Sequence, residues 1–341
     1  MNRPNILLIY TGGTIGMVRD SKEGALRAFN FNNLLQQIPE LKLLECKINS
    51  VSFDDPIDSS NMNPNHWVKL AEIIEDNYSK HDGFVVLHGS DTMSYTASAL
   101  SFMLENLSKP VVFTGSQLPI GDLRTDAKEN LITSVQVAST REKDEPIIKE
   151  VCLYFEYKLY RANRTTKINA ENFEAFASPN YPELAESGVH LKINKEYLLK
   201  PKIDKPLTVH KNFSKDVAII KLFPGISEAL LKNIFETPNL KGVVMETYGA
   251  GNCTTEQWFI NVLKEYIEGG GHIINITQCA GGSVLMGHYE TSKALKTIGV
   301  ISGSDLTTEG AITKLMFLMG EKINSKSFKT IYESPLRGEM S

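Results

Sequence analysis

The stretch NILLIYTGGTIG, residues 5–16, decides the fold of this chain. Four consecutive apolar residues, Ile6 to Ile9, lead directly into a turn that holds three glycines and two threonines. A short apolar run that ends at glycines is typical of a buried strand followed by a tight loop, and parallel strands are buried in this way when helices cover both faces of their sheet. The stretch therefore predicts the first strand of an α/β fold, with hydroxyl groups in the loop at its carboxyl end.

The same pattern of an apolar strand and a polar loop recurs along the chain. Further strands are predicted at 43–53, 84–87, 110–114, 151–155, 217–222, 242–247 and 272–277. Helical stretches lie between most of them, and one of these helices starts at Pro64 behind the capping residue Asn63. Because residues 191–212 carry lysines and prolines with little core-forming pattern, we place a linker there. We predict an α/β protein with two doubly wound parallel-sheet domains, an N-terminal domain at 1–190 and a C-terminal domain at 213–341.

The composition excludes several classes of function. The chain has 341 residues and a formal net charge of −4, so nothing in its charge favours nucleic acid or an anionic membrane as a partner. No apolar run approaches the roughly 20 residues of a membrane helix. The four cysteines are scattered, without the spacing of a zinc site or a disulfide framework. We expect a cytoplasmic protein that acts on a small molecule and needs no metal.

Glycine- and hydroxyl-rich loops follow five of the predicted strands: TGGTIG, HGSDT, TGSQ, YGAGN and TQCAGGS. Ligands of parallel sheets bind beyond the carboxyl ends of the strands, and the first three loops should share one such edge. A hydroxyl nucleophile such as Thr14 needs a base or a positive neighbour, which Lys167 could supply beside Ser90 and Asp91. Backbone N–H groups of the glycine loops could stabilise an oxyanion. This set of groups suits acyl transfer from a small amide or ester.

Each of these residues also has an ordinary structural role. Threonine and serine in strand-to-helix loops are most often helix caps, and Asp91 could cap the helix that follows it. A lone lysine such as Lys167 is usually a solvated surface residue. His88 is interpreted as a hydrogen-bonded packing residue, because no acidic partner stands near it in the sequence.

Taken together, the motifs resemble those of the bacterial cytoplasmic (type I) L-asparaginases. The match runs nearly from end to end through YTGGTIGM, DSSNM, HGSDTMSYTASA, TGSQLP, YRANRTTK, FPGIS, YGAGN, TQC and LRGE. The resemblance implies a larger N-terminal α/β domain joined by a linker to a smaller, flavodoxin-like domain. It also implies a homodimer or homotetramer whose active site lies where the N-terminal domain of one subunit meets the C-terminal domain of its neighbour. The implied reaction is the hydrolysis of L-asparagine to L-aspartate and ammonia, without metal or cofactor.

The resemblance also implies roles for individual residues. Thr14 is the nucleophile that attacks the side-chain amide and forms an acyl-enzyme, which water resolves. Ser90, Asp91 and Lys167 form the second catalytic group, in which Asp91 also binds the α-ammonium of the substrate. The α-carboxylate is held by a third segment, Asp58, Ser59 and Ser60.

Two positions depart from the family pattern. Ser90 stands where threonine is usual; it keeps the hydroxyl but lacks the methyl group that restricts the rotamer, and we expect activity to be retained. Ala25 stands where a loop tyrosine normally pairs with the nucleophile, and no tyrosine occurs between Met17 and Leu43.

A second, regulatory asparagine site occurs in some family members. The positions that line it match Thr166, Asn252 and Cys279, but the arginine expected just before YGAGN is Glu246 here. A carboxylate cannot clamp the α-carboxylate of an amino acid as a guanidinium does. Regulation by asparagine is therefore expected to be altered or absent.

Three rival functions stay open at this point. Two are enzymes, a dual asparaginase/glutaminase and the amidase part of a tRNA-dependent amidotransferase, which would carry an extra domain before the first strand. The third, a non-catalytic amino-acid sensor, is disfavoured because Thr14, Ser90, Asp91 and Lys167 are all present.

Overall fold

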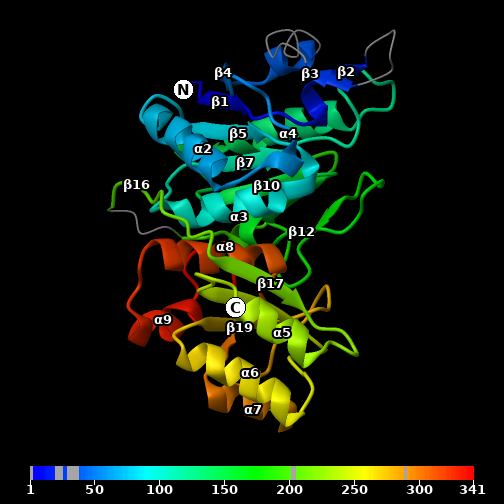
Figure 1. Ribbon diagram of the computed structural model, residues 1–341. Coiled ribbons are helices and arrows are strands. Elements are labelled where there is room, and N and C mark those ends of the chain that lie inside the picture. The colour runs from blue at the N-terminus through cyan, green and yellow to red at the C-terminus, as the bar shows by residue number, and fades with distance from the viewer. Residues whose placement is uncertain (1–2, 20–25, 29–37, 201–204, 288–289) are drawn as a thin grey trace. The chain divides into compact units, whose positions relative to one another are not determined.

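The computed structural model describes residues 3–19, 26–28, 38–200, 205–287 and 290–341 (Figure 1). The chain divides into two compact units, Met1–Lys211 and Asn212–Ser341. Both are built of strands and helices in alternation, so the predicted α/β fold class is confirmed. Residues 191–211, which the sequence analysis assigns to the linker, belong to the first unit.

In the described residues of the first unit, the main sheet has eight strands in the order β15-β14-β11-β10-β7-β5-β1-β4. Its parallel strands are β4 (Lys47–Ser52), β1 (Asn5–Tyr10), β5 (Gly83–Leu87), β7 (Val111–Thr114) and β10 (Val151–Phe155). The chain steps from β1 to β4 on one side and then returns to β5 on the other side. This is the strand order of flavodoxin-like folds, which bind ligands where the order reverses. Here that point lies beyond the carboxyl ends of β1 and β5.

Antiparallel strands extend this sheet beyond β10, namely β11 (Lys158–Arg161), β14 (Ala185–Ser187) and β15 (Leu191–Ile193). Glu156 and Tyr157 join β10 to β11 as a two-residue hairpin turn in which both residues have positive φ. The sequence analysis misses these strands, because glutamate and tyrosine are not the Asn-Gly or Asp-Gly pair that marks such a turn.

Helices cover both faces of the first sheet (Figure 1). On one face α3 (Met93–Met103) packs on β7 and β10, with α2 (Pro64–Asn77) beside it. On the other face α4 (Ala127–Ser139) joins Ile6, Leu8 and Tyr10 in one apolar cluster. The residues of β1 therefore alternate between two apolar layers and are all buried from Ile6 onward, which explains the uninterrupted apolar run.

The connections through α3 and α4 differ in handedness. From β5 to β7 and from β7 to β10 the chain steps in the same direction across the sheet, yet the two helices lie on opposite faces. One of the two crossovers is therefore left-handed, although nearly all such connections are right-handed. The long segment 115–126 before α4 gives the chain the length to reach either face.

The described residues of the second unit form a sheet of four parallel strands in sequence order: β17 (Val217–Lys221), β18 (Gly242–Thr247), β19 (His272–Thr277) and β20 (Ile301–Ser302). The connecting helices α5 (Glu228–Phe235), α6 (Gln257–Glu268) and α7 (Glu290–Ile298) share one apolar cluster with one face. The helix α8 (Thr308–Gly320) covers the other face, and α9 (Ser325–Tyr332) packs against it. The three strands predicted for this half of the chain are thus confirmed within a few residues.

A buried ion pair holds the end of the chain on α8. Lys314 Nζ lies 2.5 Å from Glu339 Oε1, and both side chains are 0% exposed. The Glu339 carboxylate also accepts hydrogen bonds from the backbone N–H groups of Leu336 and Arg337, and Lys314 donates to the Ser334 carbonyl at 2.7 Å. The terminal LRGE motif is therefore a structural element of this unit.

Among the residues with described positions, none of the helices combines the length and the apolar character that crossing a bilayer requires.

Candidate active site

Three backbone segments meet beyond the carboxyl ends of β1 and β5. Thr11, the first residue after β1, donates its hydroxyl to the Leu87 carbonyl at 3.0 Å. A Cβ on Gly12 would lie 2.1 Å from the Ile57 carbonyl oxygen, and one on Gly13 would lie 2.5 Å from Gly89 Cα. Both Gly12 and Gly13 have positive φ, 130° and 93°. Only glycine permits this conformation and this approach, so the TGG segment rests directly on the segments around 57 and 89.

Thr14 and Ser90 directly follow Gly13 and Gly89, the two glycines whose backbones touch. Each begins a single turn of 3-10 helix, η1 (Thr14–Gly16) or η4 (Ser90–Thr92). In the described residues neither turn has a side-chain cap, because Gly13 and Gly89 occupy the capping positions. The Thr92 hydroxyl donates instead to the Ser59 carbonyl at 2.7 Å. The side chains of Thr14, Ser90 and Thr92 therefore do not cap these turns or the helix after them. Thr14 is half-buried, and its neighbour Gly13 touches Gly89 of the HGSDT loop.

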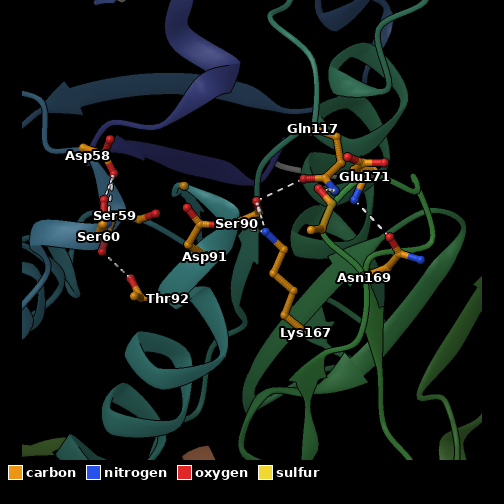
Figure 2. A network of polar contacts seen from close by, with 12 residues as sticks. Asp58, Ser59, Ser60, Ser90, Asp91, Thr92, Gln117, Lys167, Asn169 and Glu171 are labelled. Atoms are coloured by element: carbon orange, nitrogen blue, oxygen red, sulfur yellow. Dashed lines mark hydrogen bonds and ion pairs between the residues drawn. The ribbon is translucent and has the colours of Figure 1, made fainter.

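Lys167 reaches the HGSDT loop from β12 (Thr166–Lys167) (Figure 2). Its Nζ donates to Ser90 Oγ at 2.9 Å and to Asp91 Oδ1 at 2.7 Å. The Lys167 side chain is only 17% exposed, whereas that of Asp91 is 64% exposed. The structure thus brings together three of the predicted site residues, and the reading of Lys167 as a solvated surface lysine is wrong.

Gln117 completes this cluster, although the sequence analysis gives it no role. Its Oε1 accepts the Ser90 hydroxyl at 3.1 Å (Figure 2). Its Nε2 donates to the carbonyls of Ala170 and Asn172 at 3.1 and 3.0 Å. Its place in the TGSQ loop, after a strand that ends at the same sheet edge, is the signal that could have identified it.

The segment Asp58–Ser60 packs against the HGSDT loop. Asp58 caps η3 (Ser59–Asn61), because its Oδ1 accepts the backbone N–H of Ser60 at 2.9 Å and the Ser60 hydroxyl as well. These bonds lower the pKa of the Asp58 carboxyl, so that it stays ionised. Ser59 is buried, and a Cβ on Gly89 would lie 2.5 Å from its Oγ. The segment is therefore fixed beside the Ser90 cluster.

His88 holds the HGSDT loop from its buried side. It is fully buried, its Nδ1 bonds the Gly89 carbonyl at 2.7 Å, and its ring lies 6.0 Å from that of Phe113. Burial lowers the pKa of His88 to about 4, so the imidazole is neutral near pH 7. The interpretation of His88 as a hydrogen-bonded packing residue is confirmed.

The three residues of the expected regulatory site belong to different units. Thr166 neighbours Lys167 in β12 of the first unit, whereas Asn252 and Cys279 lie in the second unit. Asn252 pairs with Tyr248 in an isolated bridge, and Cys279 is exposed.

Glu246, which replaces the expected arginine, lies at the end of β18 and is buried. Its carboxylate accepts the Thr308 hydroxyl at 2.6 Å and lies 3.4 Å from Lys221 Nζ. The side chain is thus held by neighbours within its own unit.

Ala25, at the position of the loop tyrosine, lies outside the described residues. On either side of it, β2 (Met17–Arg19) and β3 (Leu26–Ala28) form an antiparallel pair.

The fold and the site define the class of protein: a two-unit α/β protein with hydroxyl, carboxylate and amine groups clustered at the reversal point of its first sheet. Comparison with known proteins gives the family. Residues 5–199 match the family model described as "Asparaginase, N-terminal", and residues 216–332 match "Glutaminase/Asparaginase C-terminal domain". The chain therefore belongs to the asparaginase family.

Individual relatives are similar to the chain over nearly its whole length. The chain is 40% identical over 343 residues to L-asparaginase 1 of Escherichia coli (strain K12), covering 100% of this chain and 99% of that protein. It is also 40% identical over 361 residues to the 60 kDa lysophospholipase of Mus musculus, covering 98% of this chain and 62% of that protein. The crystal structure of L-asparaginase I from Vibrio cholerae O1 biovar eltor str. N16961 matches with a TM-score of 0.91 at 38% identity, over 100% of both chains.

Proposed function

We propose that this protein is an L-asparaginase, which hydrolyses L-asparagine to L-aspartate and ammonia. The observation that carries the proposal is the contact of Lys167 Nζ with both Ser90 and Asp91, beside the glycine loop that bears Thr14. The full-length similarity to L-asparaginase 1 of Escherichia coli supports the choice of substrate.

In the first half-reaction, Thr14 Oγ1 attacks the carbon of the side-chain amide. The charge of Lys167 lowers the cost of deprotonating Thr14, and Ser90 accepts a hydrogen bond from the Thr14 hydroxyl as it loses its proton. Backbone N–H groups of the glycine loops stabilise the oxyanion. The proton lost by Thr14 passes to the departing nitrogen, ammonia leaves, and an ester joins Thr14 to the aspartyl group.

In the second half-reaction, water attacks this ester from the position that the ammonia has left. Ser90 and Lys167 act on the water as they act on Thr14. The proton of the water passes to the departing Thr14 oxygen, which restores the hydroxyl and releases L-aspartate. Atoms and charges balance in each half-reaction, without a cofactor.

The charged groups of the substrate find partners on both sides of this cluster. The Asp91 carboxylate is well exposed beyond its contact with Lys167 and binds the α-ammonium. Ser59 offers its hydroxyl to the α-carboxylate, whereas the N–H and hydroxyl of Ser60 can serve it only by leaving Asp58. The ionised carboxylate of Asp58 would repel the α-carboxylate of the substrate, so we assign Asp58 the capping of this turn.

We further propose that the working unit is a homodimer or homotetramer located in the cytoplasm. The oligomeric state rests on the resemblance of the motifs to those of the type I L-asparaginases. The four cysteines are unpaired, which suits a reducing compartment. Light scattering of the purified protein tests the oligomeric state.

Ammonia release from L-asparagine and L-glutamine by the purified protein tests the proposed activity. Thr14→Ala and Lys167→Met are expected to lower kcat by about 10³-fold or more, because each removes a group that acts in the transition state. Lys192→Met, at an exposed position in β15, is the control and should keep full activity.

The alternatives have distinct outcomes in the same experiment. Comparable turnover of L-glutamine identifies the dual asparaginase/glutaminase, which the description of the C-terminal family model also names. A wild-type protein that releases no ammonia, while L-asparagine raises its Tm, identifies the amino-acid sensor.

A further inference from the structure

We propose that Gln117 is a positioning residue that fixes the Ser90 hydroxyl in the orientation needed to accept a hydrogen bond from the nucleophile. The inference rests on the proposed function, in which Ser90 receives a hydrogen bond from Thr14 or from water. It concerns a residue of the TGSQ loop that lies one contact away from the reacting atoms (Figure 2).

The orientation of the Gln117 amide follows from its partners. Its nitrogen lies within hydrogen-bonding distance of two backbone carbonyls, those of Ala170 and Asn172. Carbonyl oxygens only accept hydrogen bonds, so the nitrogen must face them and Oε1 must face Ser90. The amide therefore presents a pure acceptor to the Ser90 hydroxyl.

The orientation of the Ser90 hydroxyl follows in turn. The ammonium of Lys167 only donates, so Ser90 Oγ accepts from it at 2.9 Å. Gln117 Oε1 only accepts, so the Ser90 proton points toward it at 3.1 Å. Among the described residues these are the hydrogen bonds of Ser90 Oγ, and one of its two lone pairs is left over. That lone pair is available to accept a hydrogen bond from the nucleophile.

Without Gln117, the Ser90 hydroxyl would be held by the Lys167 ammonium alone among the residues that the structure describes. Serine lacks the second Cβ substituent that restricts χ1 in threonine, so its hydroxyl has three staggered positions open to it. The Asp91 carboxylate, on the next residue, would then compete for the proton. The hydroxyl would turn, and its free lone pair would no longer face the nucleophile.

Gln117 is itself held firmly enough to act in this way. Its backbone N–H and that of Leu118 donate to the Asp126 carboxylate at 2.9 and 3.1 Å. Asp126 is 6% exposed and also accepts from Asn130 Nδ2 at 3.2 Å. The loop therefore enters the site in one conformation, as positioning requires.

The test compares Gln117→Met in two backgrounds, wild type and Ser90→Thr, with Gln136→Met at an exposed position of α4 as the control. Methionine keeps the length of the side chain and removes its hydrogen bonds. We expect kcat on L-asparagine to fall about 10–100-fold in Gln117→Met, while KM changes less than about threefold. In the Ser90→Thr background the same substitution should cost less, because the γ-methyl group limits the rotation by itself. The control should match the wild type.

Several results would overturn the inference. A Gln117→Met enzyme that keeps its kcat, or loses equal amounts in the two backgrounds, contradicts it. Ser90→Ala, measured in parallel, separates the two proposals: if this variant loses activity and Gln117→Met does not, only the positioning role fails. If Ser90→Ala is fully active, the proposed role of Ser90 falls, and that of Gln117 falls with it.

Amide hydrogen exchange provides a readout that needs no activity. Exchange in residues 168–176 should rise in Gln117→Met, because the two bonds from Nε2 hold this segment, and unchanged exchange would contradict the geometry on which the inference rests. Gln117→Asn, which keeps the amide but is one methylene shorter, serves the same comparisons if the methionine variant does not fold.

Discussion

Replacement of Lys314 by methionine should destabilise the second unit strongly. The substitution leaves the fully buried Glu339 carboxylate without its cation, which lies 2.5 Å away in the wild type. Methionine has nearly the length of the lysine stem, so most of the apolar packing of α8 is kept. The loss therefore reports mainly on the ion pair and on the hydrogen bond to the Ser334 carbonyl.

The size of the effect follows from burial. Removing one partner of a buried ion pair costs about 3–5 kcal/mol. At about 2.1 cal/mol/K of unfolding entropy per residue, and for a unit that spans Asn212–Ser341, this loss lowers Tm by about 11–18 °C. The lower end is expected, because the backbone N–H groups of Leu336 and Arg337 still bind the carboxylate.

Tryptophan fluorescence can follow the second unit alone. The chain has two tryptophans, Trp67 in the first unit and Trp258 in the second, so a Trp67→Phe background leaves Trp258 as the reporter. Lys329→Met is the matched control, because its partner Glu333 lies 3.9 Å away on the surface of α9. The control should shift Tm by less than about 2 °C.

A double variant, Lys314→Met with Glu339→Gln, tests the cause. Glu339→Gln removes the buried charge that Lys314→Met leaves unpaired. The neutral amide oxygen can still accept the backbone hydrogen bonds, so most of the lost stability should return. A Lys314→Met protein that melts within about 3 °C of its parent would refute the reasoning, as would a double variant no more stable than the single one.

Three further predictions concern pH and regulation. Burial raises the pKa of Glu156 to about 7, with help from the carboxylates of Asp126, Glu129 and Glu174. The folded protein therefore holds a proton that the unfolded chain releases near pH 4.5, and stability is lost as pH rises from about 4.5 through 7. Glu156→Gln should be more stable than the parent at pH 8 and equal to it at pH 4.5 in urea unfolding; a difference that does not change with pH would count against this. For His88, whose pKa is lowered to about 4, stability is lost as pH falls from 6.5 toward 4, because only the unfolded chain gains the proton. His88→Asn, whose amide can still donate to the Gly89 carbonyl, should reduce this loss of stability at acid pH in the same urea assay. An unchanged loss would mean that other groups cause it. With Glu246 in place of an arginine, the rate should depend hyperbolically on L-asparagine concentration, and a sigmoidal curve that responds to Cys279→Ala would refute that expectation.

Local patterns in the sequence were enough to predict most of the parallel strands of the two sheets. The apolar runs at 6–9, 84–87 and 151–155 become β1, β5 and β10, because a strand buried on both faces needs consecutive apolar residues. The N-cap of α2 at Asn63 was predicted correctly as well, since capping depends on neighbouring residues only. The loops at the carboxyl ends of these strands likewise pointed to the polar residues of the site.

Partners that lie far apart in the chain were decided by the tertiary structure alone. Ser90 and Lys167 are 77 residues apart; the family resemblance groups them, but their contact and its geometry come only from the folded chain. The role of Gln117, the burial of Lys314 against Glu339 and the placing of α3 and α4 on opposite faces are of the same kind. The physical reason is that periodicity and capping record how a residue meets solvent and its neighbours in the chain, whereas an ion pair or a hydrogen bond depends on where two separate segments come to lie.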